Sequence, residues 1–471
     1  MRHENYDFIV VGGGPAGAFF AYEMLKKNPE KRILLIEQGK RVEERKCPES
    51  TLKKCVKCKP FCNITCGFSG AGAFSDGKLS LYNKYDDDFY VGGNLHKYVG
   101  VEETKSLIDY TDKIYLDFGA TKELEGITHP GKISNIRKSA ESAGLDLINI
   151  PIRHLGTDKA HDLYKKIEET LEEAGVKMLF NTEVTDILVE NNSVQGVRYE
   201  SNKKQEEAYS QTVIMAVGRV GAKWLLKMCD KHKIKTKPGT IDIGIRYELL
   251  DEVMEEINKY LYEGKFIGKP NPFNDKVRTF CQNPSGFVTT EVYDEGLTLV
   301  NGHSCKDIKS SNTNLALLVS LNLKNVDNPM EYSRNIAKNM NTLAGGNVLV
   351  QRLGDIWQGK RTWSEELENN QVSPTLTSAT AGDIGLAMPY RVLTDILEFI
   401  KQMDKVAPGF ANPANLLYGP EIKFYSNKVS LSKTFETSVK GLYAIGDGCG
   451  LTRGLMMASA SGVQLARNLS E

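Results

Sequence analysis

Residues 7–17 read Asp-Phe-Ile-Val-Val-Gly-Gly-Gly-Pro-Ala-Gly and decide the fold class of this chain. The run from Asp7 to Val11 is short, apolar and rich in β-branched side chains, which predicts a buried strand. A helical pattern from Pro15 to about Lys27 follows the glycines directly. A strand, a glycine turn and a helix in this order are typical of a site that binds a dinucleotide.

Three of these glycines, at positions 12, 14 and 17, have the spacing G-x-G-x-x-G. We expect the first to allow a tight turn, the second to let the backbone approach a diphosphate, and the third to let helix and strand pack closely. A plain glycine turn without a ligand is the alternative. The expected cofactor contacts of the turn are Gly12, Gly14, Pro15, Ala16 and Gly17.

A second expected strand, Arg32 to Ile36, ends in Glu37, twenty residues beyond Gly17. A carboxylate at this place accepts hydrogen bonds from the ribose hydroxyls of an adenosine. Its neighbour Gln38 is expected to contact the same part of the cofactor. A solvated strand end is the other interpretation of Glu37.

Two later segments favour FAD over NAD as the dinucleotide. Residues 182–199 predict two strands joined by a turn, with Val184 in the first of them. Residues 212–218 predict a buried strand that ends in a turn at Ala216 and Gly218. This arrangement is similar to the return of the chain to the nucleotide domain in FAD-dependent reductases and hydroxylases.

The stretch Gly441 to Gly448 resembles the second FAD fingerprint of the same enzymes. In that fingerprint the aspartate, here Asp447 after Gly446, binds the ribityl chain; a turn aspartate is the alternative. A helix of small and apolar residues is expected over 454–468, with Gly454 and Leu455 at the end that points to the flavin. The dipole of such a helix favours negative charge on a reduced ring.

The order of these segments predicts an α/β protein with a discontinuous, glutathione-reductase-like Rossmann domain that binds FAD and an inserted α+β substrate domain. A helix over 158–174 is expected to be capped by Thr157 or Asp158. The expected domain bounds are 1–91 for the first FAD-binding part, with a cysteine-rich loop at 47–66, 92–150 for a helical insertion, 151–218 for the second FAD-binding part, 219–427 for the substrate domain and 428–471 for the third FAD-binding part.

Five of the nine cysteines lie between residues 47 and 66. The pair Cys55 and Cys58 has metal-ligand spacing, and Cys47 and Cys62 complete a set of four thiolates for zinc or an iron–sulfur cluster. Partly buried free thiols are one alternative. A redox pair of Cys62 and Cys66 beside the flavin is another.

Glycines recur closely from Gly67 to Gly77, which indicates close backbone approach to a ligand. We expect that ligand to be the flavin, with Gly72, Ser75 and Lys78 contacting it. An ordinary flexible loop is the alternative.

The long stretch between the FAD motifs supplies the candidate catalytic residues. Arg278 can hold a carboxylate or the developing charge of the flavin, and His303 can exchange a proton near neutral pH. Lys423 and Arg453 can stabilise negative charge at the flavin. Structural hydrogen bonds or surface ion pairs are the alternative roles of all four.

This stretch has no second glycine turn of the G-x-G-x-x-G kind placed between a strand and a helix. A dedicated NAD(P) domain is therefore not expected. Electrons are expected from transiently docked NAD(P)H, from the substrate, or from an acidic carrier protein such as a ferredoxin that docks on the basic cysteine-rich segment.

The 471 residues contain 60 Lys and Arg and 60 Asp and Glu, so the formal net charge is zero. A neutral chain favours small-molecule or protein partners over nucleic acid or anionic membranes. We find no apolar run long enough to span a membrane and no signal peptide before the first strand, so we expect a cytoplasmic protein.

With these residues in view, the chain resembles the large group of uncharacterised FAD-dependent dehydrogenases of bacteria and archaea, over nearly its whole length. More distant relatives of that group include geranylgeranyl reductases. The resemblance implies the fold and the cofactor far more than the substrate. The motifs that carry it are His154-Leu-Gly-Thr-Asp158, Gly67 to Leu79, Arg278-Thr-Phe-Cys281, Asn301-Gly-His303, Glu421-Ile-Lys-Phe-Tyr425 and Gly446 to Leu455.

The leading functional hypothesis is a dehydrogenase or reductase that moves a hydride between flavin N5 and an organic substrate, with a C=C bond as one candidate target. A flavin monooxygenase is a second hypothesis, and the clustered thiols argue against it because oxygen chemistry endangers them. A redox sensor without catalysis is a third, and a large inserted domain argues against it.

Overall fold

The computed structural model of the chain describes residues 5–47, 58–74, 77–83, 89–239, 241–261, 264–292, 296–304, 308–321, 323, 326, 329–424 and 426–470. The chain divides into two compact units. Unit 1 contains residues 1–124, 150–239 and 425–471, and unit 2 contains residues 125–149 and 240–424. Both units are therefore assembled from separate stretches of the sequence.

Unit 1 is built on a five-stranded sheet with the strand order β22-β10-β1-β2-β6, and every pairing in it is parallel. The strands β1, β2 and β10 are apolar and fully buried, as expected for a parallel sheet that is covered on both faces. The predicted α/β class with a parallel sheet is confirmed. The strands are β1 Phe8–Val11, β2 Ile33–Ile36, β6 Lys177–Leu179, β10 Val213–Met215 and β22 Leu442–Ala444.

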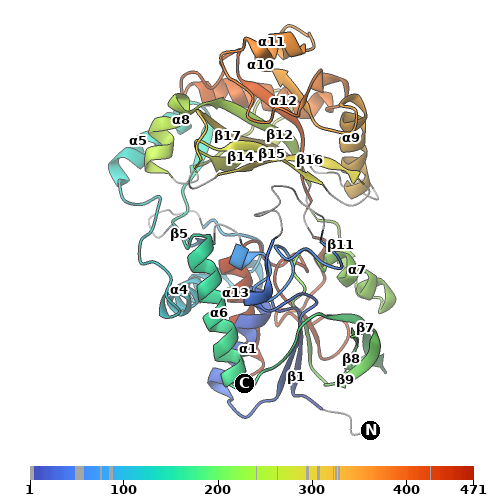
Figure 1. The fold of residues 1–471 in the computed structure, drawn as a ribbon. Coiled ribbons are helices and arrows are strands. Elements are labelled where there is room, and N and C mark those ends of the chain that lie inside the picture. The colour runs from blue at the N-terminus through green and yellow to red at the C-terminus, as the bar shows by residue number, and fades with distance from the viewer. Residues whose placement is uncertain are drawn as a thin grey trace. The chain divides into compact units, whose positions relative to one another are not determined.

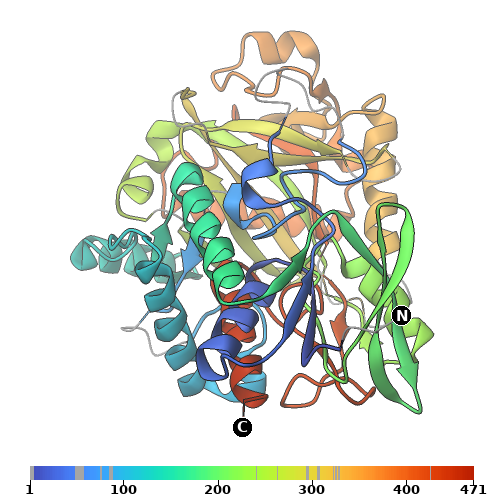
Figure 2. The same cartoon turned by 60° about the horizontal axis from the view of Figure 1, so that its bottom comes forward.

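Two helices from opposite ends of the sequence lie side by side in unit 1. The helix α1 (Pro15–Lys27) follows β1, and α13 (Leu455–Asn468) packs along it, drawn in blue and red in Figures 1 and 2. A Cβ atom at Gly462 of α13 would lie 2.2 Å from the carbonyl oxygen of Ala16, so the close packing depends on small residues. The first and last predicted segments of the nucleotide domain therefore meet.

The other elements of unit 1 surround this layer. The strands β7, β8 and β9 form an antiparallel meander, and β3 pairs with β5 and β11 with β21. The bounds are η1 Val42–Glu44, η2 Gly72–Phe74, β3 Lys78–Ser80, α3 His96–Val99, α4 Val101–Asp117, β5 Ile152–His154, α6 Thr157–Glu173, β7 Thr182–Glu190, β8 Ser193–Ser201, β9 Lys204–Tyr209, α7 Ala222–Lys231, β11 Thr236–Lys237 and β21 Lys428–Val429.

Unit 2 is built on an eight-stranded sheet with the order β19-β18-β20-β12-β17-β14-β13-β4. Its pairings are antiparallel except that of β18 with β19. The strands are β4 Leu145–Ile148, β12 Ile241–Leu250, β13 Lys265–Gly268, β14 Lys276–Asn283, β17 Asn312–Leu321, β18 Leu349–Arg352, β19 Thr380–Ala381 and β20 Leu416–Phe424.

One face of this sheet forms the apolar core of unit 2 with its helices. Ile243, Ile245 and Tyr247 of β12 pack in one buried cluster with Met340 of α9 and Phe399 of α12. The helices are α5 Pro130–Ser142, α8 Asp251–Tyr260, α9 Pro329–Leu343, α10 Leu353–Trp357, α11 Ser364–Glu368, η4 Ile384–Leu386 and α12 Tyr390–Asp404.

The other face of β12 carries the alternate residues Asp242, Gly244, Arg246 and Glu248. The polar residues Asp242, Arg246 and Glu248 are buried as well. The hairpin of β15 (Phe287–Val292) and β16 (Thr298–His303) covers part of this face, because Val288 and Val300 of the hairpin cluster with Leu416 and Tyr418 of β20. We call this side of the sheet the polar face.

The unit boundaries differ from the expected domain bounds. The helical insertion expected at 92–150 is divided, since residues up to 124 belong to unit 1 while α5 and β4 belong to unit 2, where β4 pairs with β13. The substrate domain expected at 219–427 begins too early, because α7 and β11 belong to unit 1. The N-cap residue of α6 is Gly156, not Thr157 or Asp158.

Candidate functional site

The glycine turn has the geometry that its spacing predicts. Gly12 has φ +105°, and a Cβ atom there would lie 2.5 Å from the carbonyl oxygen of Ala216. A Cβ atom at Gly17 would lie 2.2 Å from the carbonyl oxygen of Gly12. A Cβ atom at Gly14, by contrast, would meet no described atom within 4 Å. The fold therefore requires glycine at 12 and 17, whereas position 14 leaves open space beside the backbone.

The N-terminus of α1 begins at this open position. Gly14 is the N-cap residue and Pro15 the first residue of the 13-residue helix. The first N–H groups of a helix have no partner within it, and they form the positive end of the helix dipole. A diphosphate is stabilised at such an end, so the turn fits the central part of a dinucleotide.

Three strand ends meet around the turn. The N–H of Ala216 donates to the carbonyl oxygen of Val11 at 2.8 Å. A Cβ atom at Gly446 would lie 3.0 Å from the Cβ of Ala16, and one at Gly448 would lie 2.5 Å from the carbonyl oxygen of Gly218. In open α/β sheets, ligands bind beyond the carboxyl ends of the strands, where these residues lie.

Glu37 lies at the end of β2 and is buried. Its Oε2 accepts a hydrogen bond from the N–H of Gly13 at 2.8 Å, and its Oε1 accepts from the N–H groups of Gly39 and Gly67 at 2.9 and 3.0 Å. Gln38 donates from Nε2 to Sγ of Cys66 at 3.4 Å. The expected ribose carboxylate thus also holds the backbone around the turn in place.

Asp447 is held by its own neighbours. Oγ1 of Thr452 donates to its Oδ1 at 2.7 Å, and the N–H of Gly454 donates to its Oδ2 at 3.1 Å. Burial raises the pKa of Asp447, although these hydrogen bonds oppose the rise. Leu455 begins α13, and its side chain would lie 3.1 Å from a Cβ atom at Gly72. The expected ribityl aspartate and the start of α13 are therefore connected.

Other expected cofactor residues lie in neighbouring parts of unit 1. Val184 is buried in β7, two residues after Thr182, whose N–H donates to the carbonyl oxygen of Glu37. Lys78 begins β3 and pairs with His154. Ser75 lies outside the described residues.

The structure describes three of the four cysteines of the expected metal site. Cys47 and Cys58 are half-buried and Cys62 is exposed, while Cys55 lies outside the described residues. In the part of the chain that the structure describes, no three His, Cys, Asp or Glu side chains are grouped as metal ligands. Cys66, next to Gln38, is a buried free thiol whose pKa is raised by burial.

Residues 58–74, which we call the cysteine segment, fold around the guanidinium of Arg45. This side chain is buried and donates to the carbonyl oxygens of Asn63, Ile64 and Phe68. The guanidinium also lies 4.5 Å from the ring centre of Phe74. Burial lowers the pKa of Arg45 to about 10.

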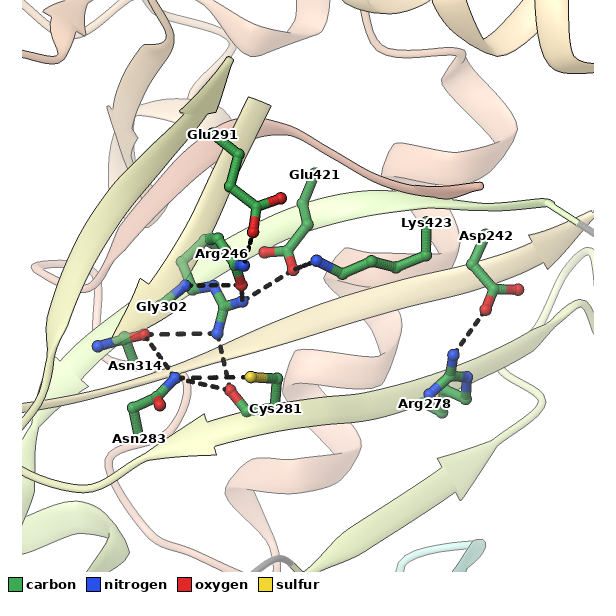
Figure 3. Close-up of polar contacts among 11 residues, drawn as sticks. Asp242, Arg246, Arg278, Cys281, Asn283, Glu291, Gly302, Asn314, Glu421 and Lys423 are labelled. Carbon is green, nitrogen blue, oxygen red and sulfur yellow. Dashed lines mark hydrogen bonds and ion pairs between the residues drawn. The ribbon is translucent and has the colours of Figure 1, made fainter. Parts of the chain in front are cut away.

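The polar face of unit 2 holds a network of charged side chains (Figure 3). Arg246 and Glu421 are both 0% exposed, and Nη2 of Arg246 lies 2.8 Å from Oε1 of Glu421. The guanidinium also donates to Oδ1 of Asn301 and to the carbonyl oxygen of Cys281. Nζ of Lys423, which is 17% exposed, lies 3.0 Å from the same oxygen of Glu421. One buried carboxylate therefore holds two cations.

Three atoms of this network have no hydrogen-bond partner among the described residues: Nε of Arg246, Oε2 of Glu421 and Nδ2 of Asn314. Buried polar atoms are nearly always satisfied in native proteins. A buried water or a polar ligand would satisfy these atoms.

Two of the four expected catalytic residues share the polar face. Nη2 of Arg278 lies 2.6 Å from Oδ2 of Asp242, and its side chain is 11% exposed. Lys423 stands directly opposite Asp242 in the pairing of β20 with β12. His303 is exposed at the end of β16, and Arg453 is exposed in unit 1. The structure thus brings Arg278 and Lys423 onto one surface, each held by a buried carboxylate.

Sequence reasoning missed Arg246 and Glu421 as members of this network. The alternation of Asp242, Arg246 and Glu248 with apolar residues in β12 resembles that of a strand with one solvated face. No signal in the sequence marks these residues, because the burial of Arg246 depends on the hairpin of β15 and β16.

Comparisons with known proteins agree with the cofactor assignment. Residues 243–423 match the model of a family described as "FAD-dependent protein, C-terminal domain-like", and this range lies within unit 2. This stretch is therefore similar to a domain of FAD-dependent proteins. The match confirms the resemblance that the motifs indicate, and FAD is the cofactor that it supports.

Similar whole chains add little about the activity. An uncharacterised protein of Clostridium beijerinckii is 24% identical, in an alignment that covers 98% of this chain and 80% of that protein. A 3-ketosteroid-Δ4-(5α)-dehydrogenase from Rhodococcus jostii has a TM-score of 0.43 at 12% identity, over 99% of this chain and 97% of that one. The L-proline dehydrogenase from P. horikoshii has a TM-score of 0.41 at 14% identity, over 99% and 94%. Both values are too low to carry over a substrate.

No helix among the described residues is long and apolar enough to cross a membrane.

Proposed function

We propose that the chain is an FAD-dependent oxidoreductase that transfers a hydride between N5 of the flavin and a small or medium-sized organic substrate, with a C=C bond as one candidate target. The open position at Gly14 carries this proposal, because it lies at the N-terminus of α1, next to Gly13, whose N–H donates to Glu37. The family match of unit 2 to FAD-dependent proteins supports it.

Unit 1 supplies the residues that would hold the cofactor. In this proposal the turn from Gly12 to Gly17 binds the diphosphate, Glu37 binds the ribose, and Asp447 binds the ribityl chain. The remaining contacts are assigned to Gln38, Gly72, Ser75, Lys78, Val184, Ala216, Gly218, Gly446, Gly454 and Leu455. Bound FAD supplies the hydride chemistry, and the protein supplies orientation and electrostatics.

The polar face of unit 2 is proposed to hold an anionic group of the substrate. Asp242 and Glu421 fix the side chains of Arg278 and Lys423, so these cations lose little freedom when they bind a carboxylate. His303 is proposed to exchange the proton that accompanies hydride transfer, because an imidazole can both donate and accept a proton. Arg453 is proposed to stabilise negative charge at the flavin.

The electron donor is proposed to be NADH or NADPH bound transiently, or an acidic carrier protein. A metal site at Cys47, Cys55, Cys58 and Cys62 is a separate proposal, with zinc or an iron–sulfur cluster as the occupant. Metal analysis of anaerobically purified protein tests it, and the absence of stoichiometric zinc and iron would rule it out.

The test of the function is an anaerobic absorbance spectrum of the purified protein, recorded before and after NADH, NADPH or reduced ferredoxin is added. We expect flavin bands that bleach with at least one of the three donors. An organic acceptor should then restore the bands faster than air does, which separates this function from a monooxygenase. Protein without flavin bands that also fails to take up FAD would contradict the proposal.

A further inference from the structure

The residues that follow β2 contact the cysteine segment at three points. Oε1 of Glu37 accepts from the N–H of Gly67 at 3.0 Å, and Nε2 of Gln38 donates to Sγ of Cys66 at 3.4 Å. The carbonyl oxygen of Lys40 accepts from the N–H of Phe68 at 2.9 Å. Both residues expected at the adenosine end of the cofactor therefore also contact the cysteine segment.

The same segment lies against the glycine turn. The N–H of Ser69 donates to the carbonyl oxygen of Gly13 at 2.8 Å. A Cβ atom at Gly70 would lie 3.8 Å from the Cα of Gly14, the open position of the turn. A dinucleotide on the turn would therefore contact the turn and the segment together.

Arg45 gives the segment its internal shape without tying it to the sheet. Its guanidinium donates to carbonyl oxygens of Asn63, Ile64 and Phe68, all of which lie within the segment. The segment is therefore ordered around Arg45. Residues 66–69 contact the end of β2 and the glycine turn through Glu37, Gln38, Lys40 and Gly13, and Phe68 anchors the segment in the core of unit 1.

Glu37 has room for one more hydrogen bond. An ionised carboxylate offers about four lone-pair positions. Three backbone N–H groups, those of Gly13, Gly39 and Gly67, already use three of them. One ribose hydroxyl can therefore bind while Gly67 remains bound, so that a single carboxylate connects the ribose with the segment.

We propose that bound FAD holds the cysteine segment closed on the glycine turn through Glu37, and that loss of FAD opens the segment and exposes Cys66. The proposal rests on the proposed binding of FAD to unit 1. A ligand that contacts both parts stabilises their contact, and a closed segment must in turn strengthen FAD binding. The exposure of Cys66 in the cysteine segment thereby depends on whether the cofactor is bound.

The test is the rate at which each cysteine reacts with iodoacetamide, measured by mass spectrometry on the full chain with and without FAD. Cys66 is 5% exposed in the closed segment, and its alkylation requires local opening. We expect this rate to rise about tenfold or more when FAD is removed. Cys229 is buried in α7 and should not react in either state, so it serves as the control for global unfolding.

The variant Glu37→Gln tests the connection itself, because the amide keeps the size but loses acceptor positions. With FAD occupancy matched by absorbance, Cys66 of this variant should react at the rate of the FAD-free protein. Glu30→Gln, in the exposed connection between α1 and β2, is the control and should retain FAD-dependent protection.

Equal Cys66 rates with and without bound FAD would overturn the inference but leave the proposed function intact. Rates that rise together for Cys66 and Cys229 would also overturn it, because the cause would be global unfolding. Failure of the chain to bind FAD would overturn the proposed function and the inference with it.

Discussion

Gly14 and Gly17 are three residues apart, yet substitution should affect them in different ways. Gly17→Ala places a methyl group 2.2 Å from the carbonyl oxygen of Gly12, so we expect unit 1 to lose about 3 kcal/mol or more of unfolding free energy. Gly14→Ala meets open space and should change that free energy by less than about 1 kcal/mol. It should instead weaken FAD binding about tenfold or more, since the methyl group occupies the place of the diphosphate.

Urea unfolding of the FAD-free variants and fluorescence titration with FAD separate the two effects. Each variant serves as the control of the other. A Gly14→Ala protein that binds FAD like the original chain would show that the diphosphate does not lie at this turn.

Asp395 of α12 should make unit 2 less stable as the pH rises. The side chain is 0% exposed and its two oxygens have no partner among the described residues. Burial, with a contribution from the nearby Asp275 carboxylate and against that of Arg391, raises the pKa of Asp395 to about 6. The folded chain therefore holds this proton more tightly than the unfolded chain. Between roughly pH 4 and pH 6 the unfolded chain has lost the proton while the folded chain still holds it, so the free energy of unfolding falls as the pH rises.

Asp395→Asn removes this titration. We expect the variant to match the original chain near pH 3, roughly, and to exceed its unfolding free energy by about 2 kcal/mol at about pH 7.5. Glu255→Gln, on the exposed side of α8, is the control and should change neither value. A gain that is equal at both pH values would contradict the assignment.

At the scale of the strands, the ion pair of Arg246 on β12 with Glu421 on β20 should contribute far more to the unfolding free energy than a surface ion pair. Both side chains are fully buried, so Arg246→Met leaves a carboxylate without its main partner and should cost about 3–5 kcal/mol. The double variant Arg246→Met, Glu421→Leu should cost less than the single one, because no buried carboxylate is left without its main partner, and Lys423, which loses its partner, is partly exposed.

The exposed pair of Arg198 with Glu207, between β8 and β9, is the matched control. Arg198→Met should cost at most about 1 kcal/mol. The measurement is urea unfolding of the three variants. A double variant as unstable as Arg246→Met would mean that the cost arises from packing, not from the charge.

The elements that sequence could predict are those whose pattern is local. The strand β1, the helix α1 and the helix α13 follow from apolar runs and glycines within a few residues of one another. The strand β4 did not, because Leu145 to Ile148 is too short for a period and its partner β13 comes much later in the chain. The burial of the polar face could not be predicted either, since alternation alone does not reveal that a hairpin covers Arg246.

At the scale of the whole molecule, the two units should respond differently to FAD. The residues assigned to the cofactor lie in unit 1, and a ligand stabilises only the part that binds it. Scanning calorimetry should show two unfolding transitions. FAD at about one hundred times its Kd should increase the unfolding free energy of unit 1 by about 3 kcal/mol and leave that of unit 2 unchanged. Equal shifts of both transitions would contradict this separation of roles.

Sequence order explains why the unit boundaries were harder to predict than the motifs. Residues 125–149 belong to unit 2 although both flanking stretches belong to unit 1. The sequence of a helix such as α5 does not indicate which sheet the helix will cover, because that depends on the pairing of β4. The glycine turn, Glu37 and Asp447, in contrast, each carry a local signature, and the structure brings them to the same end of the parallel sheet.

The most direct test of the account is equilibrium titration of the FAD-free chain with FAD and, separately, with FMN. The account places the diphosphate at Gly14 and the ribose of the adenosine at Glu37, and FMN lacks the adenosine half. We therefore expect one FAD bound per chain and binding of FMN that is weaker by about a hundredfold or more. Equal affinity for the two flavins, or binding of neither, would contradict the central claim.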